Sequence, residues 1–420
     1  MKIKMLSKKL LIAILSISML AVPLSTPAYA EEASSSTHEL PSELQTLKES
    51  YPSIQSEEEQ QSVLDKLYPD FEVVKFSHSA SCCTISKNPN TSQFEAKIGT
   101  ETVPLQTNKV IFVDDVNSGS FCDSYIIDSS VQDFTFAILP ALPGLSIYDK
   151  CPISLESGAD VTFEVNTYLK IYTETDYNES DGNLPAISVP EDANLTITGS
   201  GFLDCEIYED YDHYPADNED TGLAAAIGTA GYGSSTGQHS TPDCGDITIK
   251  DGITVYASSP RGPGIGSGAI YGSTCNQYSG DCGIISIENA TVISTCGGYS
   301  GGYSPAIGSG GVNARSCSAY AGDTSTINIT NSTVAASSVT AYEGNYAPAI
   351  GAGGACSGSL DAHGGNNGSI YVINSDIYSP SNKDDIFGGG HAKAPLFKYN
   401  GKDGNININA NSTIHPNCCF

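Results

Sequence analysis

Hydrophobic and polar residues alternate along short segments that recur through the second half of the chain. Each copy has an alternating segment rich in Ile, Val and Thr, a turn of two or three residues, and a second alternating segment. A period of two residues is typical of strands with one buried face, and no helical period interrupts it. Five copies can be read, ITIKDGITVYAS from Ile247, IISIENATVIST from Ile284, INITNSTVAASS from Ile327, IYVINSDIYSP from Ile370 and ININANSTIHP from Ile406.

A second phrase, Pro-Ala-Ile-Gly-Ser or a close variant, lies between these copies. Its spacing of 34 to 43 residues is typical of solenoids and propellers. Each repeat then holds three short strands and one long Gly/Ser-rich loop, which predicts an all-β fold, a parallel β-helix with three strands per coil. A propeller blade would need four antiparallel strands, and only three are visible. The phrase is centred on Ile153, Ile187, Ile227, Ile265, Ile307, Ile350 and, in degraded form, Phe387.

The turn between the two alternating segments carries Asn or Asp at a matching place in each repeat. These residues tolerate the left-handed backbone conformation, and stacked Asn amides can hydrogen-bond to one another, so a turn ladder is expected. The glycine after each Ile is expected to form a tight bend that leaves no room for a Cβ atom. The turn residues are Asp251, Asn289, Asn331, Asn374 and, after one inserted residue, Asn411.

Residues 1–30 have the pattern of a secretory signal peptide. Four lysines precede an apolar run over residues 10–22, and Ala-Tyr-Ala ends at residue 30 as a cleavage site. A secreted, extracellular protein is therefore expected. No lipid-anchor cysteine, second hydrophobic segment or sorting motif is visible, so no membrane insertion of the mature chain is expected.

The next segment, residues 31–75, has a helical pattern. Ser56 and Glu59 form a capping box ahead of an apolar face that includes Leu64. Two short helices are expected, forming an N-terminal helical cap that covers the open end of the solenoid. Residues 76–420 are assigned to the β-helix, with irregular first coils and regular coils from about residue 151.

Charge narrows the choice of partners. The chain has 19 basic and 48 acidic residues, and removal of the four signal lysines leaves a net charge of −33. This excess argues against nucleic acid and anionic lipid as partners, and it favours cations or cation-bridged polymers.

All 13 cysteines lie in the mature chain. Oxidising conditions outside the cell favour pairing of most of them, and the odd count leaves at least one thiol unpaired. Cys275 and Cys282 bracket one loop and could close it locally, but the sequence leaves the pairing open. Zinc binding is the alternative, although no CxxC pair exists and the two vicinal Cys pairs lack zinc-site spacing.

From Cys151 onward the chain resembles a known family. The runs CPISLESGADVTFEV, PAISVPEDANLTITGSGFLD and AAIG, followed by the alternating coils, look like the secreted bacterial right-handed β-helix proteins described as carbohydrate-binding domain-containing proteins. The likeness covers about 270 residues. It implies a right-handed, pectate-lyase-like β-helix that binds an acidic or plant-type polysaccharide, together with calcium and without established catalysis. The many cysteines of this chain depart from that pattern.

Three functions fit this fold, and the residues favour one of them. A lyase needs a base beside the substrate, and a hydrolase needs two or three convergent carboxylates. No base recurs from coil to coil, so no catalytic residue is assigned, and a monomeric polysaccharide-binding protein is preferred to an enzyme. A polysaccharide lyase is the leading enzymatic alternative, and a structural or adhesive surface protein is the third. The scattered basic and imidazole groups are Lys250, Arg261, Arg315, Lys383, Lys393, His239, His363 and His391.

Tyrosines are the candidate sugar-binding residues, because the chain has 23 Tyr and no Trp. A tyrosine offers a ring face and a hydroxyl together. The alternative is that these rings cover coil edges and pack against one another. The candidates lie in loops of successive coils, at Tyr232, Tyr271, Tyr303 and Tyr346.

Carboxylates in two loops predict a calcium site. One loop leads into PAISV and the other into AAIGT, so stacking of coils should bring both acidic sets together. Repulsion between them would be relieved by a cation, and neither loop holds Lys or Arg. Calcium accepts six to eight oxygen ligands in flexible geometry. A solvated acidic surface is the alternative. The candidate ligands are Glu174, Asp176, Asp181, Asp204, Asp210 and Asp212.

Overall fold

The computed structural model describes residues 42–51, 54, 56–76, 78–116, 122–140, 145–148, 151–175, 183–209, 222–234, 238–272, 275–298, 303–340 and 346–418. The chain divides into two compact units, residues 1–52 and 53–420. Helix α2 (Ser42–Glu49) belongs to the first unit, and the elements below belong to the second. The expected signal peptide, residues 1–30, lies outside the described residues.

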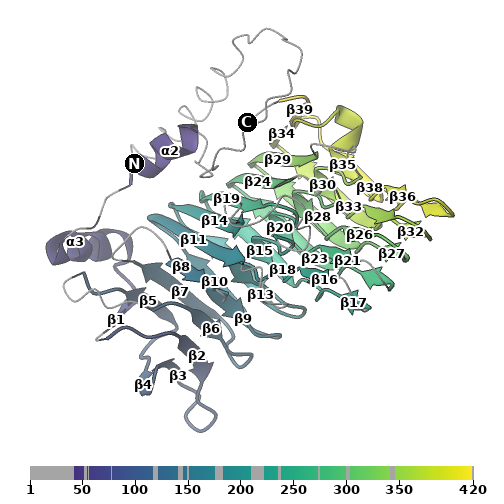
Figure 1. Ribbon diagram of the computed structural model, residues 1–420. Helices are drawn as coiled ribbons and strands as arrows, with labels where there is room; N and C mark the ends of the chain where they lie inside the picture. The colour runs from purple at the N-terminus through teal and green to yellow at the C-terminus, as the bar shows by residue number, and fades with distance from the viewer. Residues whose placement is uncertain are drawn as a thin grey trace, which may run out of the picture. The chain divides into compact units, whose positions relative to one another are not determined.

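Parallel strands of the second unit form long sheets, to which successive coils each contribute one strand (Figure 1). The first sheet comprises β1 (Glu72–Lys75), β5 (Lys109–Val113), β7 (Phe134–Leu139), β10 (Asp160–Glu164), β13 (Asn194–Thr198), β18 (Asp246–Lys250), β23 (Cys282–Glu288), β28 (Thr324–Thr330), β33 (Asn367–Ile373) and β38 (Asn405–Ile408). The second comprises β8 (Leu145–Tyr148), β11 (Tyr168–Thr175), β14 (Phe202–Glu209), β19 (Thr254–Ser259), β24 (Thr291–Gly298), β29 (Thr333–Thr340), β34 (Asp376–Tyr378) and β39 (Thr413–His415).

The third sheet holds the Ile phrase and ends in an antiparallel hairpin. It comprises β4 (Glu101–Pro104), β3 (Phe94–Ile98), β2 (Cys83–Lys87), β6 (Tyr125–Ile127), β9 (Ile153–Leu155), β12 (Ile187–Ser188), β15 (Ile227–Gly228), β20 (Ile265–Gly266), β25 (Ile307–Gly308), β30 (Ile350–Gly351) and β35 (Phe387–Gly388). Strand β3 lies between β2 and β4 and pairs antiparallel with both. The other pairings are parallel, which confirms the predicted parallel β-helix.

The copies of the Ile phrase stack in register along the third sheet. Ile153 pairs with Ile187, and the ladder continues through Ile227, Ile265, Ile307 and Ile350 to Phe387. Every isoleucine of this ladder is fully buried. The irregular spacing in sequence therefore reflects loops of different length between positions that are equivalent in space.

Alternation along each strand divides its side chains between the core and the surface. In β18, Ile247 and Ile249 are fully buried, whereas Lys250 is only half-buried. The buried positions continue from coil to coil, because Ile247 pairs with Ile285 and Ile285 with Ile327. Burial of each such side chain contributes roughly 1.5–3 kcal/mol. The core is thus a set of aliphatic ladders inside the coil.

The turn between the first and second sheets is the predicted ladder. Asp251, Asn289, Asn331 and Asn374 all have positive φ, between 50° and 67°. The Asn374 amide donates to the side-chain oxygen of Asn331 at 3.2 Å, and the Asn411 amide donates to Asn374 at 3.1 Å. These residues shape the turn and link consecutive coils.

The long Gly/Ser-rich segment after each Ile phrase is more ordered than the sequence indicates. From β15 onward it forms two further parallel sheets, labelled along one flank of the solenoid in Figure 1. The fourth sheet comprises β16 (Tyr232–Ser234), β21 (Ile270–Gly272), β26 (Val312–Ala314), β31 (Ala355–Ser357) and β36 (Ala392–Lys393). The fifth comprises β17 (His239–Ser240), β22 (Gln277–Tyr278), β27 (Ala319–Tyr320), β32 (Ala362–His363) and β37 (Lys398–Tyr399).

Small side chains allow these extra sheets to form. Ile270, Val312 and Ala319 belong to a separate buried cluster between the fourth and fifth sheets, made mostly of alanines. Close coil-to-coil approach also requires glycine, since a Cβ on Gly353 would lie 2.1 Å from the Gly310 carbonyl oxygen. The predicted loop is therefore a second, smaller core beside the main one.

Ser56 is the N-cap of helix α3 (Glu57–Leu67), as the capping box predicts. The Ser56 hydroxyl accepts a hydrogen bond from the Glu59 N–H at 3.2 Å. Its apolar face packs on the outward side chains of β5 and β7, including Ile111 and Leu139. The helix therefore covers the outer face of the first coils, a position that differs from the expected one over the open end. No helix in the described ranges is long and apolar enough to cross a membrane.

The first coils, whose register the sequence did not reveal, join the same ladders. Tyr125 pairs with Ile153 in the third sheet, and Phe134 pairs with Val161 in the first. Aromatic rings replace isoleucines in this part of the core, where Phe136 and Phe163 stack with centroids 4.7 Å apart. The wider side chains obscure the repeat in the sequence.

Candidate functional site

The four candidate tyrosines do not form one surface. Tyr232 stacks on His239 with ring centroids 3.9 Å apart, and Tyr303 stacks on Tyr346 at 5.2 Å. Tyr271 is buried, with only 6% of its surface exposed. The structure therefore brings only Tyr303 and Tyr346 together, and each of these two covers one ring face of the other. This matches the alternative in which the rings pack against one another.

A longer aromatic stack runs along the fifth sheet. Tyr278, Tyr320, His363 and Tyr399 occupy equivalent positions in four consecutive coils. Their centroids are 4.7, 4.6 and 4.4 Å apart, and successive ring planes lie within 15° of each other. Along this fifth-sheet stack the ring faces cover one another. His363, expected to be an isolated loop imidazole, is one of the stacked rings.

The fifth-sheet stack ends on an exposed aromatic pair, Phe397 and Tyr399. One face of Tyr399 lies against His363, and Phe397 lies beside it with centroids 6.4 Å apart. Phe397 is 59% exposed and Tyr399 49% exposed, the largest exposures of any Phe or Tyr in the part of the chain that the structure describes. The terminal pair thus presents apolar ring surface of the kind that stacks on sugar rings.

Lysines surround this terminal pair in sequence. Lys393, Lys398 and Lys402 fall within ten residues of a chain whose net charge is −29. Lys393 lies with its ammonium 5.4 Å from the Tyr346 ring centroid, a cation–π contact. Lys398 and Lys402 are exposed, and no described carboxylate lies within 4 Å of either ammonium. The last coil therefore combines aromatic surface with local positive charge.

The run PLFKYNGKDG from Pro395 carries this signal in the sequence. It has two exposed aromatic residues and two lysines but no Ile phrase or alternation, so the repeat pattern does not draw attention to it. The period would have indicated the stack, because Tyr278, Tyr320 and His363 are 42 and 43 residues apart, the spacing of the Ile phrases beside them.

Asp204, one of the calcium candidates, lies on strand β14 and is fully buried on the outward face of the second sheet. The Tyr168 hydroxyl donates a hydrogen bond to its carboxylate at 2.9 Å. The Lys170 ammonium lies 3.9 Å from the same carboxylate and also pairs with Glu206. A cation of the chain therefore already offsets the charge of Asp204.

Electrostatics fix the protonation of this cluster. Burial would lower the pKa of Lys170, but the Asp204 and Glu206 carboxylates outweigh it, so the pKa of Lys170 is raised. Burial and the Asp204 charge raise the pKa of Tyr168, and burial raises the pKa of Tyr256 nearby to about 12. At neutral pH Lys170 is therefore charged and both tyrosines are neutral. Lys170 is therefore not available as a neutral base.

The other calcium candidates are placed only in part. Glu174 lies on strand β11, where its backbone pairs with Tyr208. Asp176, Asp181, Asp210 and Asp212 lie outside the described residues. Among the residues that are described, no group of three or more His, Cys, Asp or Glu side chains could hold a metal ion.

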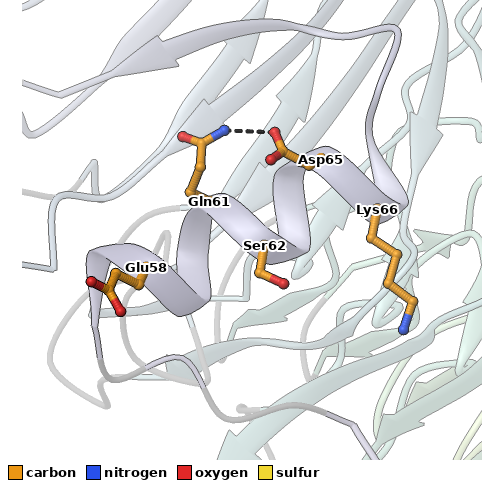
Figure 2. Close-up of a pocket in the computed structure, with 5 residues that line it drawn as sticks. All are labelled: Glu58, Gln61, Ser62, Asp65 and Lys66. Atoms are coloured by element: carbon orange, nitrogen blue, oxygen red, sulfur yellow. Dashed lines mark hydrogen bonds between the residues drawn. The ribbon is translucent and has the colours of Figure 1, made fainter.

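A shallow hollow on helix α3 is lined by polar and charged residues. Figure 2 shows its lining residues along the exposed side of the helix, where the Gln61 amide donates to Asp65 at 2.7 Å. It is lined by Glu58, Gln61, Ser62, Asp65 and Lys66. Charges of both signs on flexible side chains do not select a ligand.

Comparison with known proteins adds no second line of support. The chain matches no family model, no curated protein and no solved structure. The site must therefore be judged on its own geometry.

Proposed function

We propose that the chain is a secreted carbohydrate-binding protein that holds an acidic polysaccharide at the end of the fifth-sheet stack. The observation that carries this proposal is the exposed pair Phe397 and Tyr399 in a coil with Lys398 and Lys402. Sugar rings stack on aromatic faces, and uronate carboxylates pair with ammonium groups. The rest of the chain is strongly acidic, so this coil is where an acidic chain would meet least repulsion.

Binding is favoured over lyase chemistry by the state of the buried cluster. A lyase needs a neutral base near the substrate, and a base works best with a pKa near the operating pH. Lys170 keeps its proton because two carboxylates raise its pKa. The cluster is thus better suited to holding coils together than to proton abstraction.

Substitution of the terminal aromatic pair should weaken glycan binding. The double variant Phe397→Ala, Tyr399→Ala removes the exposed ring surface, and we expect roughly a tenfold to hundredfold loss of affinity for polygalacturonate, since stacking and desolvation of a ring are worth about 1.5–3 kcal/mol. Calorimetric titration of the purified chain would measure it.

The matched control is Tyr371→Ala, which removes a half-buried tyrosine from β33 in the first sheet. It should bind like the unchanged chain. Lys398→Ala with Lys402→Ala should weaken binding to polygalacturonate and not to a neutral glucan, and Lys250→Ala should change neither. Equal binding by the aromatic double variant and Tyr371→Ala would refute the site.

Calcium is proposed as a second ligand, held by the acidic loops that contain Asp176, Asp181, Asp210 and Asp212. The sequence supports it, because these loops are expected at equivalent places in adjacent coils and hold neither Lys nor Arg. Chelator-treated protein should melt several degrees higher once millimolar calcium is added, because a ligand that binds the folded state stabilises it by about 2.7 kcal/mol at 100 times its Kd.

Magnesium at the same concentration is the control, since it demands near-ideal octahedral geometry and usually keeps several of its bound waters. Asp210→Asn with Asp212→Asn should abolish the response to calcium. Identical melting curves with and without calcium would dismiss the site while leaving polysaccharide binding at the last coil untouched.

A further inference from the structure

Two buried cysteines face each other across consecutive coils. Cys244 and Cys282 form a parallel bridge pair, so they occupy equivalent places one coil apart. Only 4% and 2% of their surfaces are exposed. Neighbouring strands are ~4.8 Å apart, and a disulfide needs Cα atoms about 4.4–6.8 Å apart. The backbone spacing therefore already suits a disulfide bond between them.

Their side chains also interact. The Cys282 side chain is the largest cause of the raised pKa of Cys244, followed by burial and by the nearby carboxylates of Asp246 and Asp243. The Cys244 thiol is therefore protonated at neutral pH in the folded coil. Since the thiolate is the reactive form, exchange is slow once this coil has closed.

The local closure of Cys275 with Cys282 is disfavoured by the same register. Gln277 pairs with Ala319 in the fifth sheet, which places Cys275 beside Cys317 in the next coil. The Cys317 thiol donates a hydrogen bond to the Cys275 carbonyl oxygen. The Cys275 backbone therefore lies beside Cys317 of the following coil, whereas Cys282 lies beside Cys244 of the preceding coil.

We propose that Cys244 and Cys282 form a disulfide that joins two consecutive coils, with a small-molecule disulfide as the oxidant. The thiolate of one cysteine attacks the oxidant, forms a mixed disulfide and releases one small thiol. The second cysteine then attacks the protein sulfur of that mixed disulfide and releases a second small thiol. Two S–H bonds of the protein and one S–S bond of the oxidant are lost, and one protein S–S bond and two small thiols are formed.

Peptide mapping of the full chain tests this bond directly. The chain is refolded from the reduced, denatured state with oxidised glutathione, alkylated under denaturing conditions, and digested without reduction. A cross-linked peptide pair containing Cys244 and Cys282 is expected, about 2 Da lighter than the two reduced peptides together. Recovery of both cysteines as alkylated thiols, or a Cys275–Cys282 link in their place, would overturn the proposal.

Substitution gives an independent readout. Cys296→Ser is the matched control, because Cys296 is also buried but is flanked in register by Ser259 and Ser338. That variant should keep the cross-linked pair. Reductant should lower the melting temperature of the refolded chain and of the control by about 5 °C. The Cys244→Ala, Cys282→Ala double variant should melt at the temperature of the reductant-treated chain, and reductant should not lower its melting temperature further. A full response in the double variant would also reject the bond.

Discussion

Replacement of Gly266 by alanine is expected to prevent the solenoid from folding normally, with a loss of more than about 4 kcal/mol in the free energy of unfolding. Gly266 has φ of 138°, which L side chains rarely adopt, and a Cβ there would lie 1.7 Å from the Gly308 carbonyl oxygen of the next coil. Both atoms belong to backbone ladders, so neither can move without breaking pairing. Soluble yield and thermal melting by circular dichroism would measure the effect.

Gly297→Ala is the matched control for this change. A Cβ at Gly297 would meet nothing within 4 Å, and its φ lies outside the positive range. The control should fold and melt close to the unchanged chain. A Gly266→Ala protein that melts within a few degrees of the control would show that the third sheet tolerates a wider bend than its register indicates.

Lys170→Met is expected to lower the free energy of unfolding substantially. It leaves the fully buried Asp204 carboxylate, together with Glu206, without its cation, and loss of one partner from a buried pair costs roughly 3–5 kcal/mol. Denaturant midpoints should fall accordingly. Lys109→Met is the control, because its pair with Glu164 is partly exposed and should be worth less than about 1 kcal/mol.

Rescue and pH dependence distinguish lost charge pairing from lost packing. Adding Asp204→Asn and Glu206→Gln to Lys170→Met should restore most of the stability. Because the folded pKa of Lys170 is raised, its contribution is fully present below the unfolded value of about 10.4 and is lost as pH rises through the folded pKa. The difference between the unchanged chain and Lys170→Met should therefore be constant from pH 7 to 9 and shrink above pH 10. A constant difference through pH 11, or no rescue, would assign the loss to packing.

The sequence predicted the parts of the fold that depend on repetition of one residue type. The Ile phrase at Ile153, Ile265 and Phe387 marks one ladder of the core, and Asn289 and Asn374 mark one turn. In both cases every coil has the same structural requirement, either an aliphatic side chain that points inward or a left-handed bend. Because the requirement is the same at each equivalent position, the same residue type recurs in the sequence.

The sequence did not predict the fourth and fifth sheets, because the buried positions of these sheets require small side chains and not one recurring residue type. Alanine and glycine fill positions such as Ala319 and Gly353, and they show neither alternation nor a strand propensity. The candidate site at Phe397 and Tyr399 was not predicted for another reason. It lies at the exposed end of the fifth-sheet stack, and a feature that occurs only once, at the last coil, leaves no repeat in the sequence.

The charge cluster could have been predicted from the period. Lys170 and Asp204 are 34 residues apart, the same interval that separates Ile153 from Ile187 in those coils. Aligning the charged residues at that interval places the cation beside the carboxylate. Lys170 lies on strand β11, outside the loops whose carboxylates predict a calcium site, so a comparison of loop residues alone does not reveal this cation.

Because the ladders keep the same register from coil to coil, a whole coil can be inserted or deleted without changing how the remaining strands pair. Removing residues 266–307 and joining Ile265 to Gly308 would delete 42 residues and still place each remaining strand beside an equivalent partner. The solenoid would shorten by ~4.8 Å with its cross-section unchanged. Duplication or loss of whole coils is therefore an evolutionary path along which such a protein can change length while its last coil, with Tyr399, is left intact.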